Sequence, residues 1–412
     1  MSHVWRLSTV GEEFEVQLGK MLDAANNVGT PKPYLGNRAV QWGRIDVAAA
    51  GVVPLTSSDL QRFRLRAGDL LVCEGGEVGR AAIWRDELPE CYYQKALHRL
   101  RPKRGYDVRL MSALLEYWSS TGAFADYVTQ TSIAHLPREK FIEIPLPMPS
   151  RAEQRRICDV LGDADDLIAI LGRLIAKKEA VATGVKQRLL TGETRLPGFQ
   201  DEWQEVLLGD HVSYVKTISL SRAQLDADSP VRYLHYGDIH TRSGVRLDAA
   251  GDVMPRARAE LLGNAGLLEV GDLVFADASG DPDGVGKSVE VTSVPPDGVV
   301  AGLHTIAARF DKDVLADGFK AYLQFIPAFR QALLRLAAGT KVLATTRSYL
   351  SSIELAVPSV DEQRAIAAVL GDAHAEIELL RARLAKTRAV KEGMMQELLT
   401  GRTRLPDGEA AA

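Results

Sequence analysis

Two stretches of this chain have nearly the same sequence and lie half a chain apart. Residues 149–197 and 358–406 align without a gap at an offset of 209 residues, and 27 of the 49 aligned positions are identical. The chain has 412 residues, so the offset is about half its length. A repeat on this scale predicts a protein built from two equivalent halves. It also indicates a binding partner that itself has two halves.

Each copy of the repeat is predicted to begin a long helix. Ser150 and Ser359 follow a proline, and each precedes a glutamate by three residues, Glu153 or Glu362. This S-x-x-E spacing is a capping box, in which the serine and the glutamate satisfy free amides at a helix start. Apolar residues then recur at steps of three and four. In the first copy they are Ile157, Val160, Leu161, Ala164, Leu167, Ile168, Leu171, Leu174 and Ile175, and in the second Ile366, Val369, Leu370, Ala373, Ile377, Leu380 and Leu384.

Both predicted helices end in the same way. Gly192 and Gly401 suit helix C-caps, and a proline follows each of them five residues later. About 40 helical residues at ~1.5 Å rise form a rod about 60 Å long. We expect the two apolar stripes to pack together as an antiparallel coiled coil; the alternative is that each stripe packs on its own neighbouring domain. Gly172, Gly184 and Gly393 weaken the helices and are expected to mark close approaches or a slight bend.

The segments between the repeats also share landmarks in the same order, although their sequences otherwise differ. Short strand-like runs, Gly/Asp turns and one or two helices predict α/β (α+β) domains with mixed sheets in residues 1–148 and 198–357. The matched landmarks are Tyr34-Leu35 with Tyr233-Leu234, Gly68-Asp69-Leu70 with Gly271-Asp272-Leu273, Gly79-Arg80 with Gly286-Lys287, and Leu97-His98 with Leu303-His304.

Composition narrows the class of protein. Hydrophobic residues make up 46% and charged residues 25%, which is typical of globular proteins, and the net charge of −4 is unlike that of a free-standing nucleic-acid binder. Residues 61–110 are the exception, with 11 Lys/Arg against 7 Asp/Glu. Three cysteines without a C-x-x-C pair predict reduced, buried thiols. The sequence shows no signal region and no apolar run of membrane-spanning length, so we expect a cytoplasmic protein.

No catalytic or metal site is assigned from the sequence. Residues 283–288 read DGVGKS, but a phosphate-binding loop would require a glycine at the position of Asp281. His235 and His240 have a spacing that metal ligands can have, yet no third ligand is evident. We therefore expect polar loop residues at these positions.

Taken together, the two copies of P-x-x-x-E-Q-R-x-I and Q-x-L-L-T-G-x-T-R-L-P, separating two variable domains, resemble the specificity subunits of Type I restriction–modification systems. The resemblance covers essentially the whole chain. It implies target recognition domains at 1–148 and 198–357, helical spacers at 149–197 and 358–406, and a tail at 407–412.

The family resemblance also implies a function and partners. Each recognition domain would read one half of an asymmetric, bipartite double-stranded DNA site, and the helices would fix the spacing and dock two methylation subunits, which restriction subunits join. Domain centres about 40–60 Å apart would place the half-sites roughly 12–18 base pairs apart. The chain itself would be non-catalytic and hold no cofactor, because S-adenosylmethionine, ATP and Mg²⁺ would be bound by the partner subunits.

Polar and basic side chains beside the matched landmarks are the candidate DNA contacts, since Arg, Gln and Asn are usual major-groove readers. In the first domain they are Gln41, Arg44, Arg80, Tyr92, Gln94, Lys95 and His98, and in the second His235, His240, Arg242, Lys287, His304, Thr345 and Arg347. Each is otherwise a solvated charge or, for Tyr92 and His98, a framework residue. The matched places of His98 and His304 favour a shared structural or phosphate-binding role.

The repeated helix ends supply the candidate docking and spacer residues. They are Glu153, Gln154, Arg155, Leu189 and Leu190 in the first copy and Glu362, Gln363, Arg364, Leu398 and Leu399 in the second. Two other functional classes remain open at this point: a scaffold of two α/β lobes on a coiled coil that binds only proteins, and an enzyme whose site is not evident from sequence.

Overall fold

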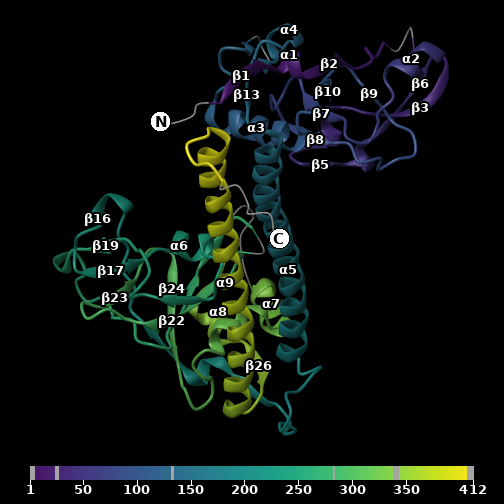
Figure 1. Ribbon diagram of the computed structural model, residues 1–412. Helices are drawn as coiled ribbons and strands as arrows, with labels where there is room; N and C mark the ends of the chain where they lie inside the picture. Colours follow the sequence, from purple (N-terminus) through teal and green to yellow (C-terminus); the bar gives the residue numbers. More distant parts are fainter. Residues whose placement is uncertain (1–4, 24–26, 131–133, 282–283, 337–342, 406–412) are drawn as a thin grey trace, which may run out of the picture. The chain divides into compact units, whose positions relative to one another are not determined.

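The computed structural model describes residues 5–23, 27–130, 134–281, 284–336 and 343–405 (Figure 1). Asp283 of the DGVGKS stretch and the predicted tail at 407–412 lie outside these residues. The chain forms two compact units: unit 1 consists of residues 1–172 and 382–412, and unit 2 of residues 173–381. The two boundaries are 209 residues apart, which is the offset of the sequence repeat. Each unit therefore combines one variable segment with part of each repeated helix.

Helices α5 (Arg151–Leu190) and α9 (Val360–Leu399) have 40 residues each. Their predicted starts are confirmed, since the Glu153 amide donates to Ser150 Oγ at 3.2 Å and the Glu362 amide to Ser359 Oγ at 3.4 Å. Their predicted ends are confirmed by left-handed φ values of 72° at Gly192 and 71° at Gly401.

The two long helices run antiparallel within each unit. In unit 1, Asp165 of α5 pairs with Lys391 of α9 at 2.7 Å. In unit 2, Lys178 pairs with Glu376 at 2.7 Å and Glu179 with Arg381 at 2.5 Å. The predicted antiparallel helices are therefore present, and ion pairs form part of their contact.

The apolar stripes also pack on the variable segments, as the alternative expected. Ile157 and Leu161 of α5 join Leu398 of α9 in the core of unit 1, and Leu190 joins Ile366 in the core of unit 2. The expectation of close helix approach at Gly172, Gly184 and Gly393 is wrong, because a Cβ atom at any of them would meet no atom within 4 Å. No helix of the described residues is long and apolar enough to cross a membrane.

Unit 1 contains one main sheet and a smaller sheet beside it. The main sheet has the antiparallel order β2-β10-β7-β8, and the smaller one has the order β6-β3-β9 with β3 and β9 parallel. The strands of these two sheets are β2 (Phe14–Leu18), β3 (Thr30–Leu35), β6 (Gly51–Leu55), β7 (Leu70–Cys73), β8 (Ala81–Ile83), β9 (Tyr92–Tyr93) and β10 (Leu97–Pro102).

Shorter elements complete unit 1. Helix α3 (Val108–Thr121) packs its apolar face into the core beside the main sheet. The remaining pairs are β1 (Arg6–Thr9) with β13 (Pro145–Met148), β4 (Val40–Gln41) with β5 (Arg44–Ile45), and β11 (Thr129–Gln130) with β12 (Ala134–His135), and the short helices include α1 (Val10–Glu13), α2 (Ser57–Arg62) and α4 (Arg138–Phe141).

Unit 2 repeats this plan with an additional strand in each of the two sheets. The orders are β15-β24-β20-β22-β18 and β16-β19-β17-β23, and β17 pairs with β23 in parallel as β3 does with β9. The strands are β15 (Val212–Val215), β16 (Leu225–Asp226), β17 (Val231–Leu234), β18 (Arg246–Asp248), β19 (Arg256–Ala257), β20 (Leu273–Ala276), β22 (Ser288–Ser293), β23 (Val299–Ala301) and β24 (Thr305–Phe310).

One further strand pair of unit 2 has a counterpart in unit 1. Strand β14 (Gln204–Leu207) pairs with β26 (Glu354–Val357) as β1 pairs with β13. The other elements are the pair β21 (Ala278–Ser279) and β25 (Leu343–Ala344), the helices α6 (Tyr236–Thr241), α7 (Pro327–Leu336) and α8 (Arg347–Ser351), and the 3₁₀ helix η7 (Lys320–Phe325).

An identical ion pair marks the shared frame. Arg101 Nη2 donates to Asp69 Oδ2 at 2.8 Å, and Arg309 Nη2 donates to Asp272 Oδ2 at 2.8 Å. Both aspartates are at most 2% exposed and follow the glycine of the Gly-Asp-Leu landmark. The predicted equivalence of these landmarks is confirmed.

The predicted equivalence of His98 and His304 is wrong by two residues. Leu100 of β10 pairs with Leu70, and Ala308 of β24 pairs with Leu273. This register places Ile306 at the position of His98, so His304 precedes its strand. The two histidines therefore cannot share one structural role.

Candidate nucleic-acid interface

In each unit, the loop after a central strand of the main sheet is held by a segment that lies ahead of a short helix. In unit 1 the Leu136 amide donates to the Glu74 carbonyl at 2.7 Å, and in unit 2 the Thr345 amide donates to the Asp277 carbonyl at 2.8 Å. Glu74 follows β7 and Asp277 follows β20, so these are equivalent contacts. The tertiary fold thereby fixes the path of a loop at one edge of each sheet.

A basic side chain attaches a third segment to the same loop. Arg80 Nη2 donates to the Asn37 carbonyl at 3.0 Å, and Lys287 Nζ donates to the carbonyls of His240 at 2.7 Å and Arg242 at 2.8 Å. Arg80 directly precedes β8 and Lys287 directly precedes β22. Both cations therefore act first as clamps on the segment that follows β3 or β17, and we call them the clamp residues.

A second contact across the loop is chemically different in the two units. Asn37 Nδ2 donates to the Gly75 carbonyl at 2.8 Å, whereas His240 Nε2 lies 3.0 Å from the Ala278 carbonyl. The backbone arrangement is thus shared while the side chains presented at it differ. This is the pattern expected of two readers built on one frame.

Three histidines surround Tyr236 in unit 2. Ring centroids lie 4.4 Å from Tyr236 for His235, 5.9 Å for His240 and 5.4 Å for His304. His304 has a φ of 55°, and its Nδ1 lies 3.2 Å from Asp277 Oδ1. The structure therefore brings together four of the sequence candidates, because Lys287 holds the segment that carries His240.

Burial shifts the pKa of several groups in this cluster. It raises the pKa of the Asp277 carboxyl, against the opposing effect of the nearby His304. It lowers the pKa of the Lys287 ammonium and of the His235 imidazole. The other second-domain candidates lie at the edge of the cluster or outside it: Arg242 pairs with Asp252 at 2.7 Å, Thr345 is buried, and exposed Arg347 lies over the Tyr214 ring.

A short hairpin carries two of the first-domain candidates. Gln41 and Arg44 face each other across β4 and β5, on either side of Trp42 and Gly43, whose φ is 65°. Gln41 Nε2 donates to the Arg38 carbonyl at 2.8 Å, and Arg44 is exposed. Trp42 Nε1 donates to Glu77, which also pairs with Arg80, so the hairpin is tied to the clamp residue of unit 1.

The remaining first-domain candidates differ in accessibility. Lys95 is exposed, and Gln94 is half-buried, with its backbone N–H donating to the Leu35 carbonyl at 3.0 Å. Tyr92 is 1% exposed with its hydroxyl on Glu90, and His98 is fully buried with Nε2 2.8 Å from the Leu136 carbonyl. Burial lowers the pKa of His98 to about 4. The placements of Tyr92 and His98 correspond to the framework role.

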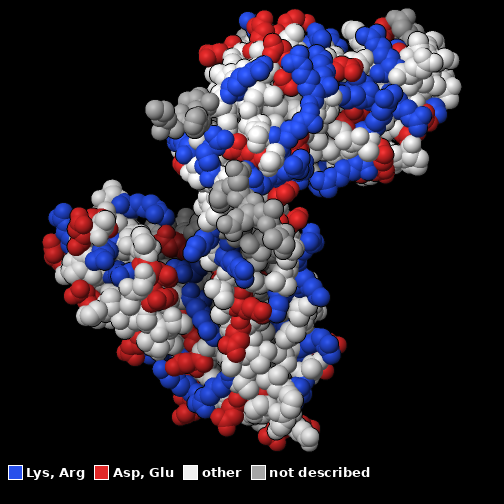
Figure 2. Space-filling model, in the orientation of Figure 1, with Lys and Arg blue, Asp and Glu red and all other residues white. Residues whose placement is uncertain are grey.

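Eight of the eleven basic side chains in residues 61–110 are exposed. Arg99 is an exception, since it is 2% exposed and pairs with Glu15 at 2.6 Å. The face of unit 1 that Figure 2 shows carries many lysine and arginine side chains, with acidic ones interspersed. Such a surface provides positive charge for contacts with phosphates.

Most of the predicted docking residues are used inside the units. Glu153 and Glu362 are at most 3% exposed and bind Arg404 and Arg195, while Gln154 and Gln363 accept from the amides of Asp107 and Ala316 at 2.8 Å. Leu189, Leu190, Leu398 and Leu399 lie in the two main cores. Only Arg155 and Arg364 of this set are exposed. Burial removes the other eight from any free docking surface.

Sequence reasoning missed Asn37, Trp42, Tyr236 and Asp277. Asn37 and Tyr236 follow the matched Tyr-Leu landmarks by two residues, so their spacing was an available signal. Asp277 follows Gly271 of the matched Gly-Asp-Leu landmark by six residues, as Glu74 follows Gly68, so its spacing was also an available signal. Trp42 gave no comparable signal, because loop packing places it. No group of three or more His, Cys, Asp or Glu side chains among the described residues could hold a metal ion.

Comparison with known proteins agrees with this geometry. A family model of the Type I restriction modification DNA specificity domain matches residues 4–179. The sequence is 22% identical to the type I restriction enzyme MjaX specificity subunit of Methanocaldococcus jannaschii, over 97% of this chain and 96% of that protein.

Solved structures share the fold over nearly the whole chain. The S subunit of a Type I restriction–modification system from M. genitalium has a TM-score of 0.59 at 14% identity, covering 99% of this chain and 98% of that one. A chain from a study of assembly and conformational transition of the type I R-M system has a TM-score of 0.59 at 16% identity, covering 96% and 98%.

The duplicated frame with divergent loops thus includes a segment, residues 4–179, that matches a DNA specificity domain. Over nearly its whole length, the chain is similar to specificity subunits of Type I restriction–modification systems.

Proposed function

We propose that each unit reads one half of an asymmetric, bipartite DNA site. The observation that carries this proposal is the pair of equivalent loop arrangements, clamped by Arg80 and Lys287, that present Asn37 in one unit and His240 in the other. Equal frames with unequal side chains would recognise two different half-sites. The recognition domains would comprise residues 1–148 and 198–357.

Base contacts are proposed for the accessible polar side chains beside these loops. Gln41, Arg44 and Lys95 would serve in unit 1, and His240, His304 and Arg347 in unit 2. Arginine and glutamine can bond to guanine and adenine edges in the major groove, and exposed lysines can neutralise phosphates. Tyr92 and His98 are left out of the proposed contact set because they are buried.

The spacer residues 149–197 and 358–406 are proposed to set the distance between half-sites and to dock methylation subunits. Two 40-residue helices, each about 60 Å long at ~1.5 Å per residue, suit a spacer. Exposed Arg155 and Arg364 are the docking candidates that remain accessible.

Catalysis is proposed to belong to partner subunits in the cytoplasm. Methylation subunits would bind S-adenosylmethionine, and restriction subunits would bind ATP and Mg²⁺. This chain would contribute DNA recognition and spacing alone. A protein-only scaffold is the alternative, and it predicts no dependence of methylation on a DNA sequence.

The decisive experiment maps methylated positions in cells that carry the chain with its methylation subunit. A split, asymmetric sequence should be methylated, and replacing residues 1–148 by another such domain should change one half of it. Methylation without a split sequence, or a change in both halves, would contradict two independent readers.

The spacer is tested separately. Four residues inserted after Gly172 and four after Arg381, at equivalent positions of the repeat, lengthen both helices by about 6 Å. The gap should widen by about two base pairs at ~3.4 Å per pair, with both half-sites unchanged. An unchanged gap would exclude the helices as the spacer.

A further inference from the structure

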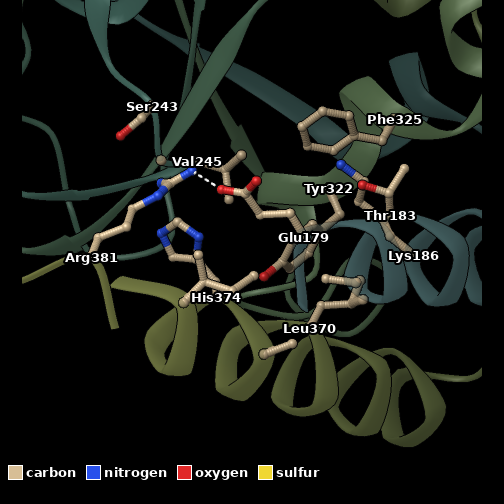
Figure 3. Close-up of a pocket in the computed structure, with 14 residues that line it drawn as sticks. Glu179, Thr183, Lys186, Ser243, Val245, Tyr322, Phe325, Leu370, His374 and Arg381 are labelled. Atoms are coloured by element: carbon tan, nitrogen blue, oxygen red, sulfur yellow. Dashed lines mark hydrogen bonds and ion pairs between the residues drawn. The ribbon is translucent and has the colours of Figure 1, made fainter. Parts of the chain in front are cut away.

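Unit 2 contains a cavity of about 240 Å³ between the two long helices and the recognition domain. Figure 3 shows the Glu179–Arg381 ion pair on one side and Lys186 with Phe325 on the other. Tyr322, Leu370, Ile377 and Val245 supply apolar surface, and His374 lies on the wall formed by α9. The volume is somewhat below the ~300–1,000 Å³ of pockets for drug-sized ligands. It therefore suits a smaller molecule.

Lys186 is the unusual group in this cavity. Its ammonium lies 3.6 Å from the centroid of the Phe325 ring, and the side chain is half-buried. Among the residues that the structure describes, none forms a hydrogen bond or ion pair with it. Burial without an anionic partner lowers the pKa of this ammonium. A carboxylate placed beside it would restore the missing counter-charge.

The other charged groups of the cavity already have partners. Arg381 donates to Glu179 and to Glu378, each at 2.5 Å. Glu179 is therefore neutralised locally, and Lys186 remains the cation available to a ligand. The ring of Phe325, which is 38% exposed, stands next to that cation and can cover an apolar group.

The equivalent place in unit 1 is filled by side chains of the chain itself. Lys391, which the repeat aligns with Ala182, pairs there with Asp165 at 2.7 Å and Glu116 at 2.9 Å. Asp165 aligns with His374, and buried Met395 aligns with Lys186. Three substitutions in otherwise similar helices thus replace an internal ion-pair cluster by an open cavity with an unpaired cation.

We propose that this cavity is a binding site for a small organic carboxylate. The carboxylate pairs with Lys186, and the apolar part of the molecule lies against Phe325 and Leu370. The site is separate from the DNA-reading loops, and it does not depend on the function proposed for them. Cation, aromatic ring and apolar wall together select an amphipathic monoanion over inorganic phosphate or a neutral analogue.

The test is to titrate the full-length chain separately with benzoate, benzamide and inorganic phosphate. Binding is measured by calorimetry and by ligand-observed NMR. Benzoate should bind at one site, at least tenfold more tightly than either of the others. Lys186→Met, which copies Met395, should weaken benzoate binding at least tenfold. Lys177→Met on the exposed surface of the same helix should leave it unchanged.

A second variant keeps the proposal testable if the first misfolds. Ala182→Lys combined with His374→Asp introduces the side chains of unit 1 and should abolish binding while the thermal midpoint is kept or raised. The proposed site would be overturned if benzoate and benzamide bind equally, or if benzoate binding survives both variants. Binding that saturates at no concentration in the titration would overturn it as well. A carboxylate peptide that binds in place of benzoate would identify a protein ligand and would equally overturn it.

Discussion

Arg195 donates two hydrogen bonds of 2.5 Å each to the Glu362 carboxylate, one from Nε and one from Nη2. Arg195 follows the end of α5 and Glu362 lies in the first turn of α9, so this contact fastens the end of one long helix to the start of the other within unit 2. In unit 1, Arg404 bonds in the same way to Glu153, which also accepts from Trp5 Nε1 at 3.2 Å. The arginine of each T-R-L-P motif thus binds the glutamate of the E-Q motif on the other long helix. We call this contact, Arg195–Glu362 in unit 2 and Arg404–Glu153 in unit 1, the joint.

Replacing Glu153 by alanine should destabilise unit 1 by about 2 kcal/mol, because Trp5 and Arg404 lose their acceptor at a buried position. Chemical denaturation of the variant measures this loss. Arg155→Ala, at an exposed position in the same turn, is the matched control and should cost under about 0.5 kcal/mol. Equal effects of the two substitutions would contradict the role assigned to the joint.

The clamp residue of unit 2 should control one half-site alone. Lys287→Met retains the aliphatic stem but removes the hydrogen bonds to the carbonyls of His240 and Arg242. We expect about tenfold poorer discrimination at the second half-site, on the scale of one lost base contact. Sequencing of methylated positions reads both halves at once, and a relaxed first half-site would count against the clamp.

His98 should make stability depend on pH. Its folded pKa of about 4 lies below the ordinary value of 6.5, so the neutral ring stabilises the folded state above pH 6.5. This contribution is lost as the pH falls from about 6.5 towards about 4, and it amounts to about 3 kcal/mol in total. Urea denaturation between pH 4.5 and 7.5 should show a flatter profile for His98→Gln. An unchanged profile would mean that His98 does not bind this proton on unfolding.

Arg44 tests the hairpin of unit 1 as a DNA-contacting element. Arg44→Ala should weaken DNA binding by the assembled complex, and the slope of log affinity against log salt should fall by about one if the contact is a phosphate. A loss of sequence discrimination confined to one base pair of the first half-site would instead indicate a base contact. Lys140→Ala, at an exposed position of unit 1 outside both candidate sets, is the control, and identical binding by the two variants would exclude the hairpin.

Much of the architecture could be predicted from local signals. The capping serines, the apolar stripe and the terminal glycines act within a few residues of one another, and for that reason the two helices begin and end where the sequence places them. The Gly-Asp-Leu and Gly-Arg/Gly-Lys landmarks were likewise matched correctly, because each is a turn joined directly to a strand. The His98–His304 match failed because a two-residue phrase does not specify strand register.

The candidate site depended on contacts that no local pattern encodes. Glu153 and Glu362 look like surface docking groups in sequence, yet burial by Arg404 and Arg195 makes them parts of a joint. Lys287 resembles a phosphate-binding lysine, but the fold directs its ammonium to two backbone carbonyls. Sequence by itself determined the duplication, the helices and the family resemblance. Only tertiary structure decided which polar groups pair with other groups inside a unit and which remain free to bind a partner. The reason is that desolvation and long-range pairing depend on the packed chain.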